Sequence, residues 1–366
     1  MKLLRYQMNS RLRILHLASF QGNFGDAVSH KGLYEILKAK YNNNFSINKL
    51  EIRRLYQNST INKLNINHNL LKKINSYDLF LIGGGGYFNI AHRQTSSGTT
   101  FDFDEDFING IKTRTIFTSI GGIDKSNASL SNKFINFIKL LSKNKNISLC
   151  LRNDGSLRSQ IKIKSIMKNE IINVCDNAFY NHDVSSTNSK KYVVVNIGTD
   201  QIKKYVGNKL NYFKQLSNFI RDYIVYKNNL RVIFIPHIHD DIISIRKTIS
   251  YFDDDFIRYF IGIEALAYDS SSINRILKIY QKSRAVLAGR YHANILGLIF
   301  NKPTYRLYPS YRVDSMLKSF DLGNRDIFSN INKFLDCDTA AMLKYQNMKL
   351  SKHIRQSRKK FLSILP

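Results

Sequence analysis

A repeated alternation of short apolar strands with helical segments is the feature that most constrains the fold. Each apolar run ends in glycine or in polar residues, and a segment with helical spacing follows it. This rhythm is typical of a parallel sheet covered by helices, the Rossmann-like arrangement. The sequence therefore predicts an α/β fold. The predicted strands are Arg11–Ala18, Ser46–Ile52, Tyr77–Ile82, Thr115–Ile120, Ile147–Leu151, Ile171–Val174, Tyr192–Ile197, Arg231–Ile235, Phe256–Ile261, Ala285–Ala288 and Thr304–Leu307.

The same rhythm runs twice along the chain, which suggests two domains. A length of 366 residues with 43% hydrophobic composition is ample for two cores. The stretch His182–Lys190 is polar and without periodicity, so it is interpreted as a linker. We expect an N-terminal domain over residues 1–183, a C-terminal domain over 191–325 and a helical extension over 326–366. The predicted helices are Ala27–Lys40, Leu130–Ser142, Leu210–Tyr226, Ile242–Tyr251, Ile273–Lys282, Ile295–Phe300, Val313–Phe320 and Thr339–Leu365.

Composition narrows the class of protein. No apolar run is long enough for a membrane span, and the first ten residues lack the apolar core of a signal peptide. The three cysteines are scattered, which fits a reducing cytosol better than a disulfide framework. A net charge of +29 favours anionic partners. Its lysines are dispersed, however, and no nucleic-acid-binding motif is present, so no specific nucleic-acid partner is expected.

The stretch Ala285–Pro303 carries the strongest functional signal. A buried strand turns through Gly289 into an apolar helix, with Arg290 and His292 at the junction. Ligands of open α/β sheets bind at such strand ends, beside helix amino termini. A permanent cation two residues from an imidazole suits an anionic substrate that must receive a proton. The alternative is that Arg290 forms an ion pair and His292 caps the helix or packs.

Other strand ends carry glycine or charge in the same way. Gly22–Asp26 follows the first strand, and the four glycines Gly83–Gly86 follow a later one, so backbone can approach a ligand closely at both places. The first loop lacks the third glycine of a dinucleotide fingerprint, and Asp26 is also a candidate helix cap. The acidic segment Phe101–Asp106 is interpreted as a solvated helix start rather than a base or metal site. His237, His239 and Asp240 have no further ligand group at metal spacing, so no metal is expected.

Taken together, these pieces resemble the polysaccharide pyruvyl transferase family. One departure from the family pattern is that Asn153 follows Arg152 where the family has aspartate, so an acid or base role at this position is in doubt. The resemblance covers roughly residues 11 to 325. The matching pieces, in order, are Gly22–Asp26, Gly83–Gly86, Arg152–Ser156, Asp176–Phe179, Pro236-His237, Gly289–Ala293 and Pro303.

The resemblance implies two Rossmann-like domains facing a central cleft, as in GT-B glycosyltransferases. It implies phosphoenolpyruvate as co-substrate, no other cofactor, and a sugar acceptor, with a pyruvate ketal as product. The N-terminal domain would be the acceptor side and the C-terminal domain the donor side. Donor-binding roles carry over to Arg152, Arg290 and His292.

Three catalytic roles complete this expectation. His292 would donate the proton, Arg290 would stabilise the leaving phosphate, and Asp26 would serve as base for a sugar hydroxyl. The residues expected to contact the acceptor or close the site are Gly22, Asn23, Gly25, Gly84, Gly85 and His237. We expect a cytoplasmic enzyme of exopolysaccharide or capsule synthesis. Its acceptor could be free, nucleotide-linked or lipid-linked, and a basic C-terminal helix leaves peripheral contact with the inner membrane face open.

Two other functions remain compatible with the sequence. A GT-B glycosyltransferase would present its arginine to the diphosphate of a nucleotide-sugar, so the choice of donor discriminates it. A non-enzymatic binder of nucleic acid or anionic lipid would depend on the +29 charge alone, and its binding would disappear at moderate salt.

Overall fold

The computed structural model describes residues 11–56, 62–89, 95–100, 102–123, 131–155, 171–181, 190–206, 209–323 and 339–366. Contacts divide the chain into two compact units. Unit 1 takes in the described residues of Met1–Phe20, Gly32–Tyr180 and Arg355–Pro366, and unit 2 those of Gln21–Lys31 and Asn181–Ile354. The predicted linker lies outside the described residues, apart from Lys190.

Unit 1 is built on a six-stranded sheet in the order β2-β1-β3-β5-β7-β8, with every pair parallel. Its strands are β1 (Leu12–Ala18), β2 (Phe45–Glu51), β3 (Leu79–Gly83), β5 (Arg114–Ile120), β7 (Ile147–Arg152) and β8 (Ile172–Val174). A second, short parallel pair joins β4 (Phe88–Asn89) to β6 (Gly122–Ile123). The helices are α1 (Phe24–Tyr41), η1 (Ile52–Leu55), α2 (His68–Asn75), α3 (Glu105–Gly110), α4 (Asn132–Lys143) and η2 (Asn177–Asn181).

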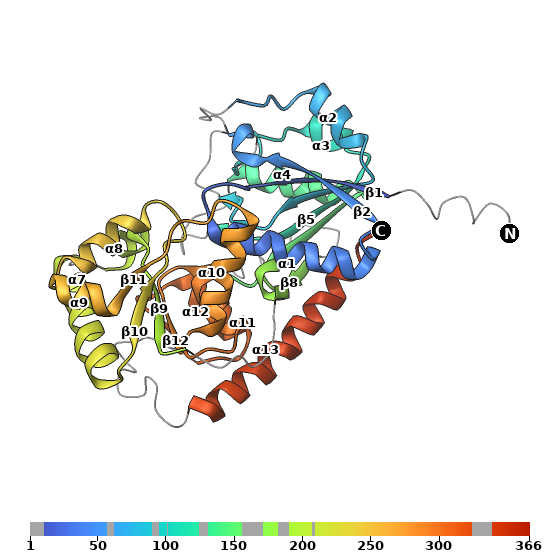
Figure 1. Cartoon of the computed structure of the whole chain (residues 1–366). Helices are drawn as coiled ribbons and strands as arrows, with labels where there is room; N and C mark the ends of the chain where they lie inside the picture. The colour runs from blue at the N-terminus through green and yellow to red at the C-terminus, as the bar shows by residue number, and fades with distance from the viewer. Residues whose placement is uncertain are drawn as a thin grey trace. The chain divides into compact units, whose positions relative to one another are not determined.

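Both faces of this sheet are covered, because successive residues of a strand point to opposite sides. Leu15 of β1 belongs to a core that includes Phe134 of α4. Its neighbour Ile14 belongs to a second core with Leu33 of α1 and Phe361 near the carboxyl terminus. Figure 1 shows α2, α3 and α4 on one face of the sheet and α1 on the other. Burial on both faces explains why the central strand β3 is apolar along its whole length.

The acidic segment after residue 101 is a helix start, as interpreted from the sequence. Asp104 is the N-cap of α3, and its side chain accepts a hydrogen bond from the backbone N–H of Phe107 at 2.8 Å. Glu105 and Asp106 lie in the first turn, where the helix dipole favours negative charge.

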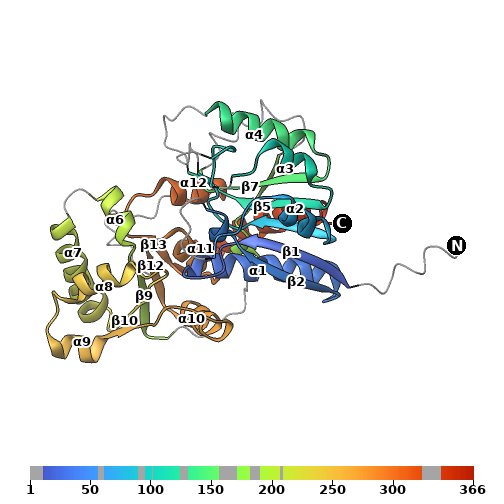
Figure 2. The same ribbon diagram turned by 90° about the horizontal axis from the view of Figure 1, so that it is seen from above.

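Unit 2 repeats the architecture with a five-stranded parallel sheet in the order β11-β10-β9-β12-β13. Figures 1 and 2 show α7 and α8 on one side of this sheet and α10 and α11 on the other. Its strands are β9 (Tyr192–Asn196), β10 (Arg231–Phe234), β11 (Ile261–Ile263), β12 (Ala285–Ala288) and β13 (Thr304–Arg306). Its helices are α6 (Thr199–Tyr205), α7 (Lys209–Asn218), η3 (Phe219–Lys227, a π-helix), α8 (Asp241–Ile249), α9 (Asp254–Phe260), α10 (Ser270–Lys282), α11 (Tyr291–Ile299), α12 (Tyr311–Ser319) and α13 (Thr339–Leu362).

The predicted strand Phe256–Ile261 is wrong. This segment is mostly helix α9, and the strand β11 begins only at Ile261. Asp253 caps the helix by accepting a hydrogen bond from the N–H of Phe256 at 2.7 Å. Phe256 packs on Phe252 and Phe260, with ring centroids 4.7 and 5.2 Å away. An aspartate cap with aromatic residues four apart favours a helix, and this outweighs the β-propensity of the individual residues.

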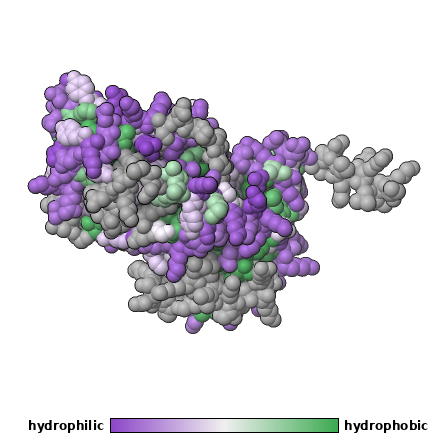
Figure 3. Space-filling view, turned by 90° about the horizontal axis from the view of Figure 1, so that it is seen from below, coloured by the Kyte–Doolittle hydropathy of each residue, from purple (hydrophilic) through white to green (hydrophobic). Residues whose placement is uncertain are grey.

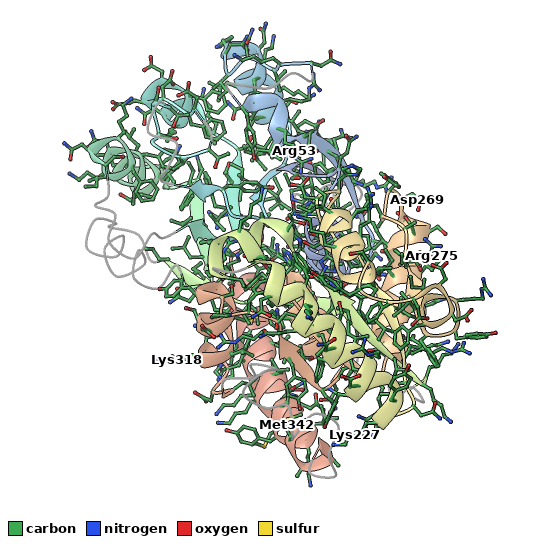
Figure 4. The ribbon with its side chains drawn as sticks, turned by 90° about the vertical axis from the view of Figure 1, so that its left-hand side faces the viewer. Arg53, Lys227, Asp269, Arg275, Lys318 and Met342 are labelled. Carbon is green, nitrogen blue, oxygen red and sulfur yellow. The ribbon has the colours of Figure 1, made fainter. Side chains whose placement is uncertain are left out.

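Helix α10, which leads into β12, begins with a capping box. The side chain of Asp269 accepts from the N–H of Ser272 at 2.7 Å, and the hydroxyl of Ser272 accepts from the N–H of Asp269 at 3.1 Å. Arg275 pairs with Glu264 at 2.8 Å at this end of the helix, and Figure 4 shows Asp269 and Arg275 near one another there. These contacts set the start of the helix that precedes the strand carrying the candidate site.

Helices α1 and α13 each contribute residues to both units. The first turns of α1 belong to unit 2 and the remainder to unit 1. In α13 the residues through Ile354 belong to unit 2, and those from Arg355 belong to unit 1. Within unit 1 the hydroxyl of Ser357 accepts from the N–H of Cys175 at 2.7 Å.

None of the helices in the described ranges combines the length and the apolar character that crossing a membrane requires. The face of the molecule in Figure 3 is predominantly hydrophilic, with scattered apolar spots.

Candidate active site

The strand ends of unit 2 bring three loops together. Strands β10, β9 and β12 are neighbours in a parallel sheet, so their carboxyl ends share one edge. Asn196, the last residue of β9, connects the loops that follow the other two strands. Its Oδ1 accepts from the N–H of Arg290 at 3.0 Å, and its Nδ2 donates to the carbonyl of Ile235 at 2.9 Å. The candidate site lies at this edge.

Gly289 forms a turn with no room for a side chain. A Cβ there would lie 2.4 Å from the hydroxyl oxygen of Tyr308 and 2.7 Å from the carbonyl oxygen of Asn196. The turn places Arg290 at the N-cap of α11 in an extended conformation. Arg290 and His292 therefore stand at the amino end of a helix, where the backbone dipoles favour an anion.

Arg290 is held by two carboxylates. Its Nε donates to both oxygens of Asp241, at 2.9 and 2.8 Å, and its Nη2 donates to Asp200 at 2.7 Å. The ion pair that the sequence left open as an alternative is therefore present. The two partners differ in burial, because the side chain of Asp241 is 0% exposed and that of Asp200 is 49% exposed.

These contacts favour the charged forms of Arg290 and Asp200. Burial lowers the pKa of Arg290, but the hydrogen bond and charge of Asp241 and the charge of Asp200 outweigh it, so its pKa lies above the ordinary value. Burial raises the pKa of Asp200, yet the charge of Arg290 and the hydrogen bonds from Gln201 and Arg290 bring it below the ordinary value. Asp241 also accepts from the N–H groups of His237 and Ile238, at 2.9 and 3.3 Å.

His292 packs against the first loop of the chain. A Cβ on Gly25 would lie 2.1 Å from Nδ1 of His292 and 2.5 Å from its Cγ, so only glycine allows this approach. Phe24 anchors the same loop by donating its N–H to the carbonyl of His237 at 2.9 Å. The structure thus brings together two motifs that are more than 260 residues apart in the sequence.

Within this loop Asn23 is a cap of helix α1. The side chain of Asn23 accepts from the N–H of Gly25 at 2.9 Å, and its carbonyl accepts from Ala27 at 3.2 Å. Asp26 lies in the first turn of α1 and is half-buried. Gly22 has a φ of 70°, in the left-handed region that favours glycine.

His237 is buried beneath the loop and electrically neutral. Its Nε2 lies 2.8 Å from the hydroxyl of Tyr280, and its ring meets that of Phe24 edge-on at 4.9 Å. Burial, together with the charges of Arg290 and His292, lowers its pKa well below the ordinary value. Within the described ranges, no three or more His, Cys, Asp or Glu side chains form a group that could hold a metal ion.

Arg152 lies in unit 1 and is buried to 2% exposure. Its Nε donates to Asp154 at 2.8 Å and its Nη1 to Asp176 at 2.7 Å, and both carboxylates are fully buried. Gly121 leaves space for the group, since a Cβ there would lie 2.5 Å from both Nε of Arg152 and Oδ2 of Asp154. These are the contacts of a buried ion-pair cluster, and the carboxylate at Asp154 is part of it.

The glycine run of unit 1 forms a tight turn. Gly83 and Gly84 have φ values of 121° and 88°, which other residues rarely adopt. Gly84 donates its N–H to the carbonyl of Thr118 at 2.9 Å, and Gly85 accepts from Gly121 at the same distance. These contacts join the run to the end of β5, where the pairing register shifts between Phe117 and Ile120.

Sequence reasoning missed the acidic and amide partners of Arg290, namely Asp241, Asp200 and Asn196. Asn196 lies at the end of the predicted strand Tyr192–Ile197 and Asp200 lies three residues beyond it, so the strand-end rule applied to Arg290 would have found them. Asp241 carries no such signal, because its role depends on the approach of α8 to Arg290.

The chain matches one known family over most of its length. The family model for polysaccharide pyruvyl transferase matches residues 23–311, a range that includes Asn23, Arg290 and His292. Among curated protein sequences none matches this chain significantly.

Solved structures share the fold at low identity. S. aureus MnaA with UDP has a TM-score of 0.55 at 13% identity, with 97% of this chain and 98% of that chain covered. UDP-GlcNAc 2-epimerase from Neisseria meningitidis, bound to UDP-GlcNAc, has a TM-score of 0.54 at 10% identity, with 96% and 99% covered. Anabaena HepE in complex with UDP and glucose has a TM-score of 0.52 at 10% identity, with 97% and 100% covered. The predicted fold class, two Rossmann-like domains of GT-B type, is confirmed, and the chain belongs to the polysaccharide pyruvyl transferase family.

Proposed function

We propose that this protein transfers pyruvate from phosphoenolpyruvate to a sugar of a cell-surface polysaccharide or its precursor and forms a ketal. The proposal rests on the presence of Arg290 and His292 together at the amino end of α11, with Gly25 packed against the imidazole. An arginine fork and a helix amino terminus suit a donor with a carboxylate and a phosphate.

The reaction requires one proton at the methylene carbon of the donor and two hydroxyl groups of the sugar. His292 protonates the methylene carbon of the donor, while a first hydroxyl attacks the carbon that bears the phosphate. Phosphate then leaves, and a second hydroxyl of the same sugar closes the ring. The two hydroxyl protons balance the one placed on carbon and the one carried off by phosphate. Arg290 stabilises the charge that develops on the leaving phosphate.

Asp26 is our candidate base for a sugar hydroxyl. It is half-buried on the first turn of α1, one residue after Gly25. The side chain of Asn23 caps the same helix by accepting from the N–H of Gly25. The proposed acceptor and loop contacts are Gly22, Asn23, Gly25, Gly84, Gly85 and His237.

The donor-binding role of Arg152 has less support. Its guanidinium is 2% exposed and already serves two buried carboxylates. We therefore rest donor binding on Arg290 and His292, and we assign Arg152 to holding the strand ends of unit 1 in place. The same reaction can use an acceptor that is free, nucleotide-linked or lipid-linked. A cytoplasmic enzyme with access to the inner membrane face would encounter each form.

A thermal-shift titration tests the donor. We would titrate phosphoenolpyruvate, UDP-sugars and GDP-sugars into the wild type and Arg290→Ala, since a ligand that binds only the folded form raises Tm. Arg275→Ala is the matched control, because it removes an exposed arginine of the same unit. We expect stabilisation by phosphoenolpyruvate that Arg290→Ala loses and Arg275→Ala keeps. Stabilisation by a nucleotide-sugar without a response to phosphoenolpyruvate would replace this function with that of a glycosyltransferase.

A further inference from the structure

The surroundings of Arg290 hold one negative charge more than the guanidinium neutralises. Asp241 and Asp200 both pair with it. An anionic donor would add at least one further negative group to the same cation. Three anions around one guanidinium repel one another strongly in a partly buried site. One of the two carboxylates must therefore give way when an anion binds here.

The two carboxylates differ in what holds them. Asp241 is 0% exposed, and it accepts from the N–H groups of His237 and Ile238 as well as from Arg290. Moving it would leave a buried charge without partners. Asp200 is 49% exposed, and its side chain meets Nη2 of Arg290 at 2.7 Å and Nε2 of Gln201 at 2.6 Å. The side chain of Asp200 can rotate into solvent, where water hydrates its carboxylate.

The backbone that carries Asp200 is anchored, so the change is confined to its side chain. Asp200 lies in the first turn of α6. The preceding residue, Thr199, donates its hydroxyl to the carbonyl of Asp240 and lies 2.7 Å from the hydroxyl of Ser244 on α8. A rotation of the Asp200 side chain therefore frees one N–H of Nη2 of Arg290 while α6 stays in place. The other N–H of Nη2 still donates to Asp241 at 2.5 Å.

We propose that Asp200 acts as an internal anion that occupies the N–H of Arg290 Nη2 that Asp241 does not use, and that the carboxylate or phosphate of the donor displaces it. This inference rests on the proposed function for the identity of the donor, but the exchange itself requires only an anion. Asp200 then sets donor affinity, because the competent state is the fraction in which that N–H of Nη2 is free. It also excludes weakly charged ligands, because these do not displace the Asp200 carboxylate from the guanidinium of Arg290.

Asp200→Asn tests the exchange, since it keeps the shape of the side chain and removes its charge. The matched control is Asp222→Asn, which removes an exposed carboxylate that pairs with Arg221 elsewhere in the unit. We would measure Kd for phosphoenolpyruvate and for inorganic phosphate by calorimetry at one fixed, low ionic strength. We expect Asp200→Asn to bind both anions about tenfold more tightly, and Asp222→Asn to match the wild type.

The arms of this experiment separate the inference from the proposed function. Unchanged or weaker binding of both anions by Asp200→Asn overturns the inference, as does an equal gain in Asp222→Asn. Tighter phosphate binding without any binding of phosphoenolpyruvate supports the exchange and overturns the donor. Absence of binding of both anions to every variant overturns both.

Two further variants complete the design. In the background of Arg290→Ala, the gain from Asp200→Asn should vanish, because the two residues act on one site. Asp200→Ser serves as a second charge-removing variant, and it should show the same direction if Asp200→Asn folds poorly.

Discussion

At the scale of single residues, Arg290 and His292 differ in how strongly their surroundings hold them. Arg290 is fixed by Asp241, Asp200 and the turn at Asn196. His292 is half-buried and packs on Gly25, a contact of shape rather than of charge. A fixed cation such as Arg290 suits the binding of an anion, and a titratable ring such as that of His292 suits the delivery of a proton.

Replacing His292 with Asn should separate chemistry from binding. Asn fills much of the same volume but cannot deliver a proton at neutral pH. We expect kcat to fall by about 10²–10⁴-fold, while Kd for phosphoenolpyruvate rises by a smaller factor, because Arg290 still binds the donor. Steady-state assays with calorimetry on the same samples measure both quantities. His239→Asn is the control, since His239 is exposed. Full activity of His292→Asn would remove the proton-donor role.

At the scale of elements, the site depends on helix starts. Helix α11 begins at Tyr291, after its N-cap Arg290, because Gly289 turns tightly after β12. Helix α1 begins at Phe24, after Asn23 and the positive φ of Gly22. The N–H of Phe24 holds the start of α1 against the loop of His237. Local capping and turn interactions thus determine where α1 and α11 begin, and packing within unit 2 brings these two helix starts into contact.

Gly25→Ala should disturb this contact. The added methyl would lie 2.1 Å from Nδ1 of His292, so the ring must rotate away. We expect a loss of about 1–3 kcal/mol in unfolding free energy and a marked fall in kcat. Urea denaturation and steady-state assays measure the two effects.

Gly323→Ala is the matched control for this change, because a Cβ at Gly323 meets nothing within 4 Å. It should keep both stability and turnover. Turnover of Gly25→Ala at the wild-type level would show that the position of the His292 ring does not matter for the reaction.

At the scale of the whole molecule, each unit has apolar cores of its own. Unit 1 has apolar cores on both faces of its sheet, and unit 2 has one built around β9, β10 and β12. The buried Arg152 cluster belongs to unit 1, and the Arg290 cluster belongs to unit 2. A mutation in either cluster should therefore act first on its own unit, and unfolding need not be two-state.

Arg152→Met should destabilise unit 1 severely. It leaves Asp154 and Asp176 buried without their cation, and breaking a buried pair in this way costs about 3–5 kcal/mol. The control, Arg221→Met, removes an exposed pair and should cost less than about 1 kcal/mol. Calorimetric melting measures both.

A second variant separates structure from binding at Arg152. Adding Asp154→Asn and Asp176→Asn to Arg152→Met should restore part of the lost stability, because the uncompensated charges are gone. A stable Arg152→Met protein that no longer binds phosphoenolpyruvate would instead assign Arg152 to the donor, as the family resemblance implies.

The sequence by itself determined most of the strands and helices and the positions where backbone must be glycine. Local periodicity and turn chemistry depend on neighbouring residues. The strand Ala285–Ala288 and the glycine turns at positions 22, 83, 84 and 289 could therefore be predicted from the sequence. The strand predicted at Phe256–Ile261 is helix α9 instead, because the cap at Asp253 and the packing of Phe256 on Phe252 and Phe260 favour a helix.

Tertiary structure decided which of these local pieces meet. The ion pairs of Arg290 with Asp241 and Asp200 depend on the order of β10, β9 and β12 in the sheet, and so does the contact of Gly25 with His292. The assignment of Gln21–Lys31 to unit 2 is also invisible in the order of the chain. Strand order and the exclusion of water from charged pairs are long-range properties, because they arise only when distant segments pack together.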